Sequence, residues 1–499
     1  MASGPARDGP LIARNPATGL DLGHHPTTPP GEVAEIVRRA SVAQAAWGST
    51  PWKSRRDALR SWWAVLTKDA EAWSLAIRDE VGKPASEAMA EVVASLDAIR
   101  WTVRNSGRAL ADERLARGWQ RVLLIPPARL RWAPLGVVGI IGTWNYPLLL
   151  NAPAIAQALA AGNAVAWKPS ELAVGLGRRL QDSTREAGFP DGLVSAIYGK
   201  ADAARALIGS GIAKAIFTGG VEGGRQVLAE LGRRGIPALA ELSGFDAAIV
   251  LPDAPPESTT RALAWASFVG AGQTCVAVKR AYVVGDPSPW ASGLADRAKA
   301  LRVGDPSRGE VDVGPMISPE ARDRFHATVG AAVALGAKVL AGGRPIEGPG
   351  SFYEPTVLLS DDPAVESTLA GCFGPVVLVR GFANDDAAVE AANASPFGLS
   401  GSVWGRDLRR ARSVASRLEV GTVAVNDAVT TSAHAAAPFG GCKASGFGRV
   451  RGVVGLRELA QARVIHVRKP GGFRPHLFPY GPLMPRIFSA YRRIFHPRG

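Results

Sequence analysis

Cys275 and Glu241 are the residues of this chain whose types suit a two-step covalent reaction. Cys275 ends the segment 272–275 (Gly-Gln-Thr-Cys), and small and apolar residues precede it over 262–271. A cysteine thiolate can attack a carbonyl carbon, and a nearby carboxylate can then activate water against the covalent product. The alternative is an inert core residue, because a free cysteine in apolar surroundings packs as a small hydrophobe.

The composition indicates a large globular protein. Its 499 residues are 46% hydrophobic and 20% charged, which is enough apolar material for two or more packed cores. The three cysteines, Cys275, Cys372 and Cys442, form no C-x-x-C pair, so neither a disulfide framework nor a zinc site is expected. Such cysteine usage is typical of a reducing compartment, and we expect a cytoplasmic protein.

The sequence shows no secretory signal and no membrane span. Residues 1–10 are rich in Gly, Pro and Ala, lack the apolar core of a signal peptide, and are expected to form a frayed tail. The longest apolar stretch, residues 148–161, is interrupted by Asn151 and Gln157 and is shorter than the roughly 20 residues that cross a bilayer.

A formal net charge of +14 suits an anionic partner such as nucleic acid, an acidic membrane or a phosphorylated cofactor. The alternative is a solvated surface, since the arginines are scattered through segments expected to be helical. We find no zinc-finger spacing, no RNA-binding aromatic motif and no basic region followed by heptads, and so expect no nucleic-acid partner.

Strand-like and helix-like segments alternate in the first half of the chain, which predicts a mostly parallel sheet with helices on both faces. Such sheets bind ligands beyond the carboxyl ends of their strands, where Asn145, Lys168, Gly219 and Glu241 fall. The expected strands are 137–142, 164–168, 194–198, 213–218, 238–242 and 247–250, with helices at 148–161 and 172–187.

A second alternating series follows Cys275 and predicts a second α/β domain. Pro252, Pro255 and Pro256 punctuate the chain between the two series, so the boundary is expected near residues 244–258. The expected strands are 279–284, 338–341, 376–380, 400–404 and 421–425, with helices at 318–335 and 408–418.

Gly219 and Gly224 bracket the start of the helix expected after strand 213–218. Backbone N–H groups at a helix start can bind a pyrophosphate. Neither a P-loop ending nor a G-x-G-x-x-G follows a strand here, and glycines that permit close helix packing are the alternative.

Seven motifs together resemble the aldehyde dehydrogenase superfamily, in matching order and separation over residues 15–467. They lie at 143–147 (Thr-Trp-Asn-Tyr-Pro), 168–171 (Lys-Pro-Ser-Glu), 217–219 (Phe-Thr-Gly), 241–244 (Glu-Leu-Ser-Gly), 272–275 (Gly-Gln-Thr-Cys), 373–376 (Phe-Gly-Pro-Val) and 438–446 (Pro-Phe-Gly-Gly-Cys-Lys-Ala-Ser-Gly).

The resemblance implies an α/β fold of three parts: a Rossmann-type cofactor domain, an α/β catalytic domain and a β oligomerisation arm, assembled as a homodimer or homotetramer. It places the NAD(P)-binding domain at residues 1–117 and 134–246 and the catalytic domain at 247–437. The arm and its adjoining segment are expected at 118–133 and 438–468, with a hairpin near 118–132 and a late strand near 462–467, followed by a basic tail at 469–499.

The implied reaction is the oxidation of an aldehyde to a carboxylic acid with NAD or NADP. Cys275 would attack the aldehyde carbon, and the Asn145 amide with the Cys275 backbone N–H would stabilise the oxyanion. After hydride leaves for the nicotinamide, Glu241 would activate the water that hydrolyses the thioester.

The cofactor-binding residues implied by the resemblance begin with Lys168 and Glu171, which would hold the adenosine ribose. Glu171 would accept a hydrogen bond from a free 2′-hydroxyl and repel a 2′-phosphate, which favours NAD, with NADP as the alternative. The other residues expected to contact the cofactor are Thr143, Trp144, Ser170, Gly219, Gly220, Gly224, Leu242 and Phe373.

The chain departs from the family pattern at Gly371, where the family usually has the carboxylate that binds the nicotinamide ribose. A looser nicotinamide, a substitute group or an impaired enzyme would explain this departure. If the ribose lacks its ligand, Gly371→Glu is expected to speed hydride transfer, provided the side chain has room. Gly220 and Phe245 differ from the usual residues too, and we interpret both as tolerated variation.

The end of the chain is basic and amphipathic, with no acidic residue beyond Glu458. Such a helix suits an anionic membrane surface and would favour long apolar aldehydes, while the alternative is docking of its apolar stripe on the enzyme itself. The stripe comprises Met484, Ile487, Phe488, Tyr491, Ile494 and Phe495, and the basic residues are Arg463, Arg468, Lys469, Arg474, Arg486, Arg492, Arg493 and Arg498.

Three functions are therefore considered. The first is a hydrolytic NAD(P)-dependent aldehyde dehydrogenase. A CoA-acylating relative is the second, and Glu241 argues against it because transfer to CoA needs no water-activating base. The third is a non-catalytic scaffold of the same fold, which Gly371 favours and Cys275 with Asn145 opposes.

Overall fold

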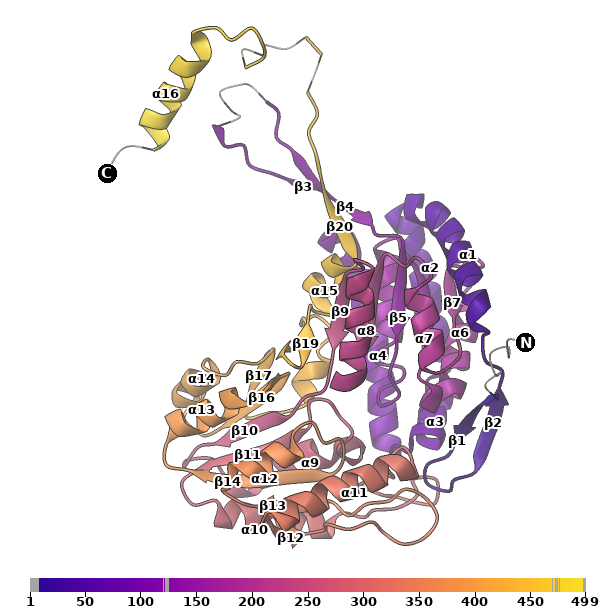
Figure 1. The fold of residues 1–499 in the computed structure, drawn as a ribbon, viewed down its shortest axis with the longest axis vertical. Helices are drawn as coiled ribbons and strands as arrows, with labels where there is room; N and C mark the ends of the chain where they lie inside the picture. Colours follow the sequence, from indigo (N-terminus) through magenta and orange to yellow (C-terminus); the bar gives the residue numbers. More distant parts are fainter. Residues whose placement is uncertain are drawn as a thin grey trace, which may run out of the picture.

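The computed structural model describes residues 9–119, 121, 125–468, 470–471, 474 and 476–496. Two α/β lobes lie one above the other in Figure 1, and a thin arm projects from the first lobe away from the second. Residues 1–8 of the expected N-terminal tail lie outside the described residues, as do Lys469, Phe473 and Arg498 of the C-terminal tail.

The first lobe is built on a six-stranded sheet with the order β19-β9-β8-β5-β6-β7. Neighbours in it are parallel, except that β19 runs antiparallel to β9. The strands are β5 (Val137–Ile141), β6 (Ala164–Lys168), β7 (Val194–Ala196), β8 (Lys214–Thr218), β9 (Ala238–Glu241) and β19 (Gly446–Phe447).

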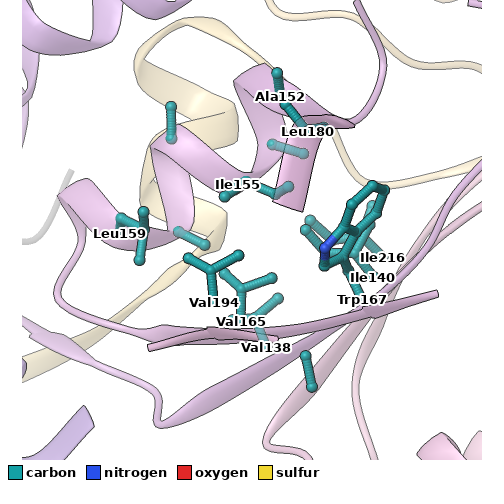
Figure 2. Packing of buried hydrophobic residues seen from close by; sticks show 14 of the residues in the cluster. Val138, Ile140, Ala152, Ile155, Leu159, Val165, Trp167, Leu180, Val194 and Ile216 are labelled. Atoms are coloured by element: carbon teal, nitrogen blue, oxygen red, sulfur yellow. The ribbon is translucent and has the colours of Figure 1, made fainter. Parts of the chain in front are cut away.

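Helices surround this sheet, and buried aliphatic side chains fill the space between them. In Figure 2, Ile155 and Leu159 of α5 lie against Val138 and Val165 of the sheet. The helices are α1 (Pro30–Ser49), α2 (Trp52–Lys68), α3 (Ala70–Val81), α4 (Ala85–Ala109), α5 (Ala152–Ala160), α6 (Val174–Glu186), α7 (Ala201–Ile208) and α8 (Val221–Arg233), preceded by the hairpin of β1 (Leu11–Arg14) and β2 (Asp21–His25).

The second lobe has a seven-stranded sheet with the order β12-β13-β14-β11-β10-β16-β17, parallel except for the β12–β13 pair. Its strands are β10 (Asp246–Val250), β11 (Val278–Val284), β12 (Lys338–Ala341), β13 (Thr356–Leu359), β14 (Val376–Phe382), β16 (Ser400–Trp404) and β17 (Thr422–Val425). Its helices are α9 (Pro256–Phe268), α10 (Ser288–Ala300), α11 (Pro319–Ala334), α12 (Pro363–Leu369), α13 (Asp385–Ala394) and α14 (Leu408–Ala415).

The arm is a three-stranded antiparallel sheet, β20-β4-β3, that combines the first third of the chain with its end. It comprises β3 (Glu113–Arg114), β4 (Arg129–Pro134) and β20 (Ala460–Ile465), the last of which follows α15 (Gly452–Glu458). Beyond β20 the chain turns back into α16 (Leu483–Phe495), beside the hairpin in Figure 1.

The α/β fold class is confirmed. The strands expected at 164–168, 338–341 and 400–404 match β6, β12 and β16 residue for residue. The helix expected at 148–161 begins only at Ala152, because Pro153 is tolerated in a first helical turn and would break an interior one. The arm strands lie a few residues from their expected places, and the division into domains stays a prediction.

Within the described residues, no helix is long and apolar enough to cross a membrane.

Candidate active site

A cavity of about 420 Å³ lies between the two lobes and brings together Cys275, Asn145 and Glu241. Asn145 follows β5 and Glu241 ends β9, so both extend from carboxyl ends of the first sheet. Cys275 reaches the same cavity from the loop before β11 of the second lobe. The three residues expected to do chemistry therefore share one space.

The loop that carries Cys275 is held in an unusual backbone conformation. Gly270, Ala271 and Gly272 all have positive φ, at 64°, 53° and 66°. A Cβ at Gly272 would lie 2.2 Å from the carbonyl oxygen of Gly374, so only glycine fits there. Ala271 adopts this conformation at a cost of about 1 kcal/mol, the penalty of the left-handed region for a residue with a side chain.

The Asn145 side chain is oriented by two hydrogen bonds. Its Nδ2 donates to the carbonyl oxygen of Gln273 at 3.0 Å, and the Thr143 hydroxyl donates to its Oδ1 at 3.0 Å. An amide nitrogen carries two hydrogens, so one remains for a ligand oxygen in the cavity.

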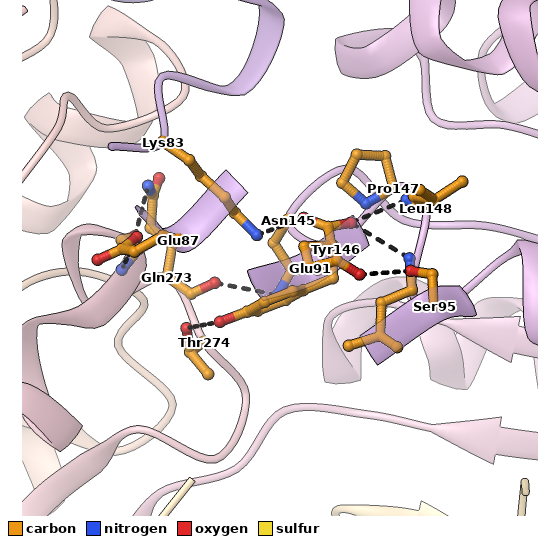
Figure 3. Close-up of polar contacts among 12 residues, drawn as sticks. Lys83, Glu87, Glu91, Ser95, Asn145, Tyr146, Pro147, Leu148, Gln273 and Thr274 are labelled. Atoms are coloured by element: carbon orange, nitrogen blue, oxygen red, sulfur yellow. Dashed lines mark hydrogen bonds and ion pairs between the residues drawn. The ribbon is translucent and has the colours of Figure 1, made fainter. Parts of the chain in front are cut away.

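A buried polar network braces the same two loops against helix α4 (Figure 3). The Tyr146 and Thr274 hydroxyl oxygens lie 2.9 Å apart, and Lys83 Nζ lies 3.3 Å from the centre of the Tyr146 ring. Lys83 pairs with Glu91 at 2.6 Å, and Glu91 accepts from the backbone of Leu148 at 2.9 Å. Since every link is buried or half-buried, the network fixes Asn145 relative to the cysteine loop.

Glu241 is enclosed, and neither of its carboxylate oxygens has a hydrogen-bond partner among the described residues. Burial raises its pKa to about 8, against the opposing charges of Arg451 and Arg449. A Cβ at Gly440 would lie 2.8 Å from Glu241 Oε1, so this glycine makes room for the carboxylate.

Burial, with the charges of Asp246 and Glu241, raises the pKa of the Cys275 thiol to about 12. Arg451 and the Val276 backbone N–H act in the other direction. Arg451 is itself buried, lies 4.8 Å over the Phe439 ring, and has an Nη1 without a hydrogen-bond partner among the described residues. The thiol is therefore neutral at rest.

A second cavity of about 700 Å³ extends from the first and shares with it Thr143, Trp144, Thr218 and Gly219. Lys168, Ser170 and Glu171 line it, and Lys168 Nζ donates to Glu171 Oε2 at 2.9 Å. Together the two cavities form one cleft with a polar far end.

Among the expected cofactor residues, Gly220, Leu242 and Phe373 line the first cavity. Gly220 is the N-cap of α8 and offers no side-chain cap, so the first N–H groups of that helix have no side-chain partner at this position. Gly224 lines neither cavity. A Cβ there would lie 2.5 Å from Leu242 Cδ2, so this glycine permits packing of α8, the alternative considered from the sequence.

Gly371 lies in the wall of the first cavity, with φ at +76°. A Cβ at this position would be strained and would lie 3.2 Å from Phe397 Cζ. A side chain at this position would need the Phe397 ring to shift by a few tenths of an ångström, and the expected effect of Gly371→Glu stays a prediction. Of the described residues that line this cavity, Glu241 is the only carboxylate.

Sequence reasoning missed Arg451, Asp246 and the Lys83–Glu91 pair. Asp246 begins β10, and Arg451 follows the motif at 438–446, but neither residue type in its place indicates an electrostatic effect on Cys275. Lys83 and Glu91 lie eight residues apart around the start of α4, and only burial shows that they form a pair.

Comparisons with known proteins give matches over nearly the whole chain. The model of the aldehyde dehydrogenase family matches residues 6–465. The chain is 33% identical over 454 residues to the 4,4′-diapolycopene aldehyde oxidase of Methylomonas sp, covering 90% of this chain and 84% of that protein. It is 34% identical over 483 residues to the NAD(+) benzaldehyde dehydrogenase of Pseudomonas putida, covering 94% of this chain and 95% of the relative.

A solved structure has a fold similar to that of this chain. A Mycobacterium tuberculosis aldehyde dehydrogenase complexed with NAD+ superposes with a TM-score of 0.88 at 27% identity, covering 94% of this chain and 96% of that one.

Proposed function

We propose that this chain, which belongs to the aldehyde dehydrogenase family, oxidises a long-chain apolar aldehyde to a carboxylic acid through a thioester on Cys275. Family membership makes the protein an NAD(P)-dependent oxidoreductase that acts on an aldehyde. The observation that carries the rest of the proposal is the cavity in which Cys275, Asn145 and Glu241 meet.

The first step forms a bond between Cys275 Sγ and the aldehyde carbon. Because the thiol is neutral at rest, its proton leaves as the bond forms and passes to water that enters the cavity, so the Glu241 carboxylate stays ionised for the second step. The aldehyde oxygen becomes an oxyanion, which the free N–H of Asn145 and the Cys275 backbone N–H stabilise where the charge develops.

The two-part cleft fits a dinucleotide cofactor, which when bound supplies the nicotinamide that accepts the hydride from the aldehyde carbon. Lys168 and Glu171 would hold the adenosine ribose, and the N-terminal N–H groups of α8 beside Gly220 would hold the pyrophosphate. The Glu171 carboxylate would repel a 2′-phosphate, which favours NAD over NADP.

Oxidation leaves a thioester on Cys275, and Glu241 then takes a proton from water as the water oxygen attacks the thioester carbon. The carbon–sulfur bond breaks, the carboxylic acid leaves, and the cysteine regains a proton. Glu241 can act as this base only when ionised, so a pKa of about 8 predicts hydrolysis that accelerates as pH rises through 8.

An apolar substrate is supported by the cavity wall around Cys275, whose lining includes Trp144, Leu150, Leu399 and Phe439. The relative from Methylomonas sp is named for a polyene aldehyde, 4,4′-diapolycopene aldehyde. Other relatives are named for betaine aldehyde and succinate semialdehyde, so the family name alone does not select the substrate.

Peripheral attachment to an anionic membrane is the second part of the proposal, because it would bring the enzyme to such substrates. On α16, Ile494 is 69% exposed and Phe495 58% exposed beside Arg492 and Arg493. Phe488 of the same helix packs edge-on against Trp119 of the hairpin, with ring centres 5.6 Å apart, so part of the stripe docks on the arm.

Oligomerisation through the arm completes the proposal, as a cytoplasmic homodimer or homotetramer. The sheet β20-β4-β3 projects from the body and exposes Val464 and Ile465. Light scattering on the eluting peak of a sizing column measures the mass of the particle, and a monomer at micromolar concentration would contradict this part.

Purified protein tested with NAD and with NADP against straight-chain aldehydes of increasing length is the direct test. We expect kcat/KM to rise with chain length, because each added methylene buries apolar surface worth about 0.8 kcal/mol. A preference for short or acidic aldehydes would contradict the substrate class, and the Cys275→Ala protein is the control for non-enzymatic reduction of the cofactor.

Sedimentation with vesicles tests the membrane part separately. We expect binding to vesicles that contain an anionic lipid, weaker binding to neutral ones, and loss of binding when residues 477–499 are deleted. Equal binding of the full-length protein to both kinds of vesicle, or undiminished binding of the truncated protein to anionic vesicles, would contradict it.

A further inference from the structure

The loop that carries Cys275 is attached to the first lobe at Gly270 as well as at the contacts described above. The Gly270 backbone N–H donates to Oε2 of Glu87, in the first turn of α4, at 2.9 Å. In Figure 3, Glu87 lies at the side of the network where Gln273 of this loop is found. A carboxylate of one lobe therefore binds the backbone of the loop that the other lobe contributes to the cavity.

This contact satisfies a backbone group that no regular element serves. Gly270 follows the end of α9 and has a φ of 64°, so its N–H needs an acceptor from elsewhere in the fold. The Gly270 carbonyl oxygen accepts from the Gln273 backbone N–H at 3.0 Å and from Gln273 Nε2 at 3.1 Å. The Gln273 carbonyl oxygen accepts in turn from Asn145. A displacement of Gly270 would therefore reach both proposed oxyanion donors, the Asn145 amide and the Cys275 backbone N–H.

The charged and titratable groups around Glu87 come from α4 and from the loops on either side of it. Burial raises the pKa of Glu87 to about 7, against the opposing effects of the Lys83 charge and of the Gly270 hydrogen bond. Glu91, one turn later on α4, forms the ion pair with Lys83 at 2.6 Å. Burial also raises the pKa of the Tyr146 hydroxyl, which therefore stays protonated. Glu87 thus changes its charge near neutral pH, within the range of an enzyme assay.

We propose that Glu87 is a positioning residue for the attack on the aldehyde, because its carboxylate holds Gly270, and through it the Cys275 loop, in the conformation that this step needs. This inference rests on the proposed function. An ionised carboxylate is a stronger hydrogen-bond acceptor than a neutral carboxyl or amide group. Glu87 is not part of the lining of either cavity of the cleft, so it acts through the loop and not on the substrate or the cofactor.

The rate of the first turnover tests this role, followed as NADH formation by stopped-flow absorbance at saturating NAD and aldehyde. The variant is Glu87→Gln, which keeps the shape of the side chain and removes its charge. The matched control is Glu80→Gln, because burial raises the pKa of Glu80 to about 7 as well. Glu80 accepts from the backbone N–H groups of Gly175 and Leu176 at 2.7 Å each, and so holds the start of α6 and not the cysteine loop.

We expect the ratio of the wild-type rate to the Glu87→Gln rate to depend on pH. Well below pH 7, Glu87 of the wild type is protonated and resembles glutamine, so the ratio should be near one. As pH rises through 7, the wild-type carboxylate ionises and the ratio should climb to about tenfold. The ratio removes the pH dependence of the Cys275 thiol, which both proteins share. The ratio of wild type to Glu80→Gln should stay constant over the same range.

Thermal unfolding distinguishes this role from a purely structural one. Folding raises the pKa of Glu87 above its ordinary value of 4.5, so its ionised form opposes folding, and stability is lost as pH rises from 4.5 to about 7. Glutamine avoids this loss. Glu87→Gln should therefore melt no lower than the wild type at pH 8, although its first turnover is slower there.

Two results would overturn the proposal. One is a ratio of wild type to Glu87→Gln that does not change with pH. The other is a Glu87→Gln protein that melts well below the wild type or does not fold, which would assign the carboxylate a structural role. In both cases a normal first turnover of the wild type leaves the proposed function standing, whereas a wild type that forms no NADH would overturn both.

Discussion

The cavity has two differently built sides, which we call the floor (Cys275, Asn145 and Glu241) and the wall (Gly371 and Arg324). The floor is enclosed and braced, since Asn145 is held by Thr143 and by the cysteine loop. The wall offers a bare glycine and an exposed arginine without an ion pair among the described residues. The groups that we propose to form and break bonds are thus held in place by the protein itself, whereas the wall offers a ligand few fixed side-chain contacts.

Of the substitutions on the floor, Cys275→Ala is expected to lower aldehyde oxidation the most. We expect aldehyde oxidation to fall below a few per cent, because the covalent bond forms at this sulfur, while the Kd of NADH stays within about twofold. Steady-state NADH production and NADH fluorescence titration measure the two effects. Substantial turnover in this variant would show that the floor does not contain the nucleophile.

Glu241→Gln should separate the two halves of the reaction. If deacylation needs this carboxylate, NADH should appear as a burst near one equivalent per site and then stop. Stopped-flow absorbance at saturating aldehyde measures the burst and the later rate. Unchanged steady turnover would contradict the assignment, and a missing burst would mean that Glu241 is already needed for proton removal from Cys275.

Arg451→Leu should shift the pH dependence of aldehyde oxidation. Arg451 lowers the pKa of Glu241, which burial raises to about 8, so losing this cation should raise that pKa further. The rising limb of kcat against pH should then shift to higher pH, and activity at pH 7 should fall. Arg451→Lys, which keeps the charge, is the control, and an unshifted profile in Arg451→Leu would show that the charge does not reach Glu241.

Gly371→Glu should have the smallest effect, and it tests whether a carboxylate on the wall changes the reaction. The left-handed backbone there disfavours a side chain by about 1 kcal/mol, so we expect a slightly lower melting temperature and no faster burst. Gly371→Ala carries the same strain without the carboxylate. A burst that is faster in Gly371→Glu than in Gly371→Ala would show that a carboxylate does reach the ribose, and the contrast between floor and wall would weaken.

Much of the fold could be predicted because the buried strands are short β-branched and apolar runs between glycines and helices. β6, β12 and β16 were located to the residue for this reason. The start of α5 was not, because the apolar pattern of 148–161 continues across a turn that Pro153 imposes. Patterns of apolar residues report burial, and burial does not distinguish a turn from a helix.

The floor was predictable and the wall was not. Cys275, Asn145 and Glu241 lie in motifs whose order fixes their meeting place. Arg324 belongs to an ordinary amphipathic helix, and Arg451 to a loop, so their relation to the cavity depends on how two lobes pack. The sequence shows that position 371 lacks a carboxylate. The positive φ of Gly371, however, is a property of the folded loop that the residue type alone does not determine.

The pairing of β4 with β20 has a consequence for biosynthesis. β4 leaves the ribosome more than 300 residues before its partner β20, and β9 leaves it about 200 residues before its partner β19. Until then both strands present unpaired backbone groups that can bind other chains. The nascent chain is therefore prone to aggregation until β19 and β20 have been made, and a chain truncated ahead of β19 would retain both open edges permanently.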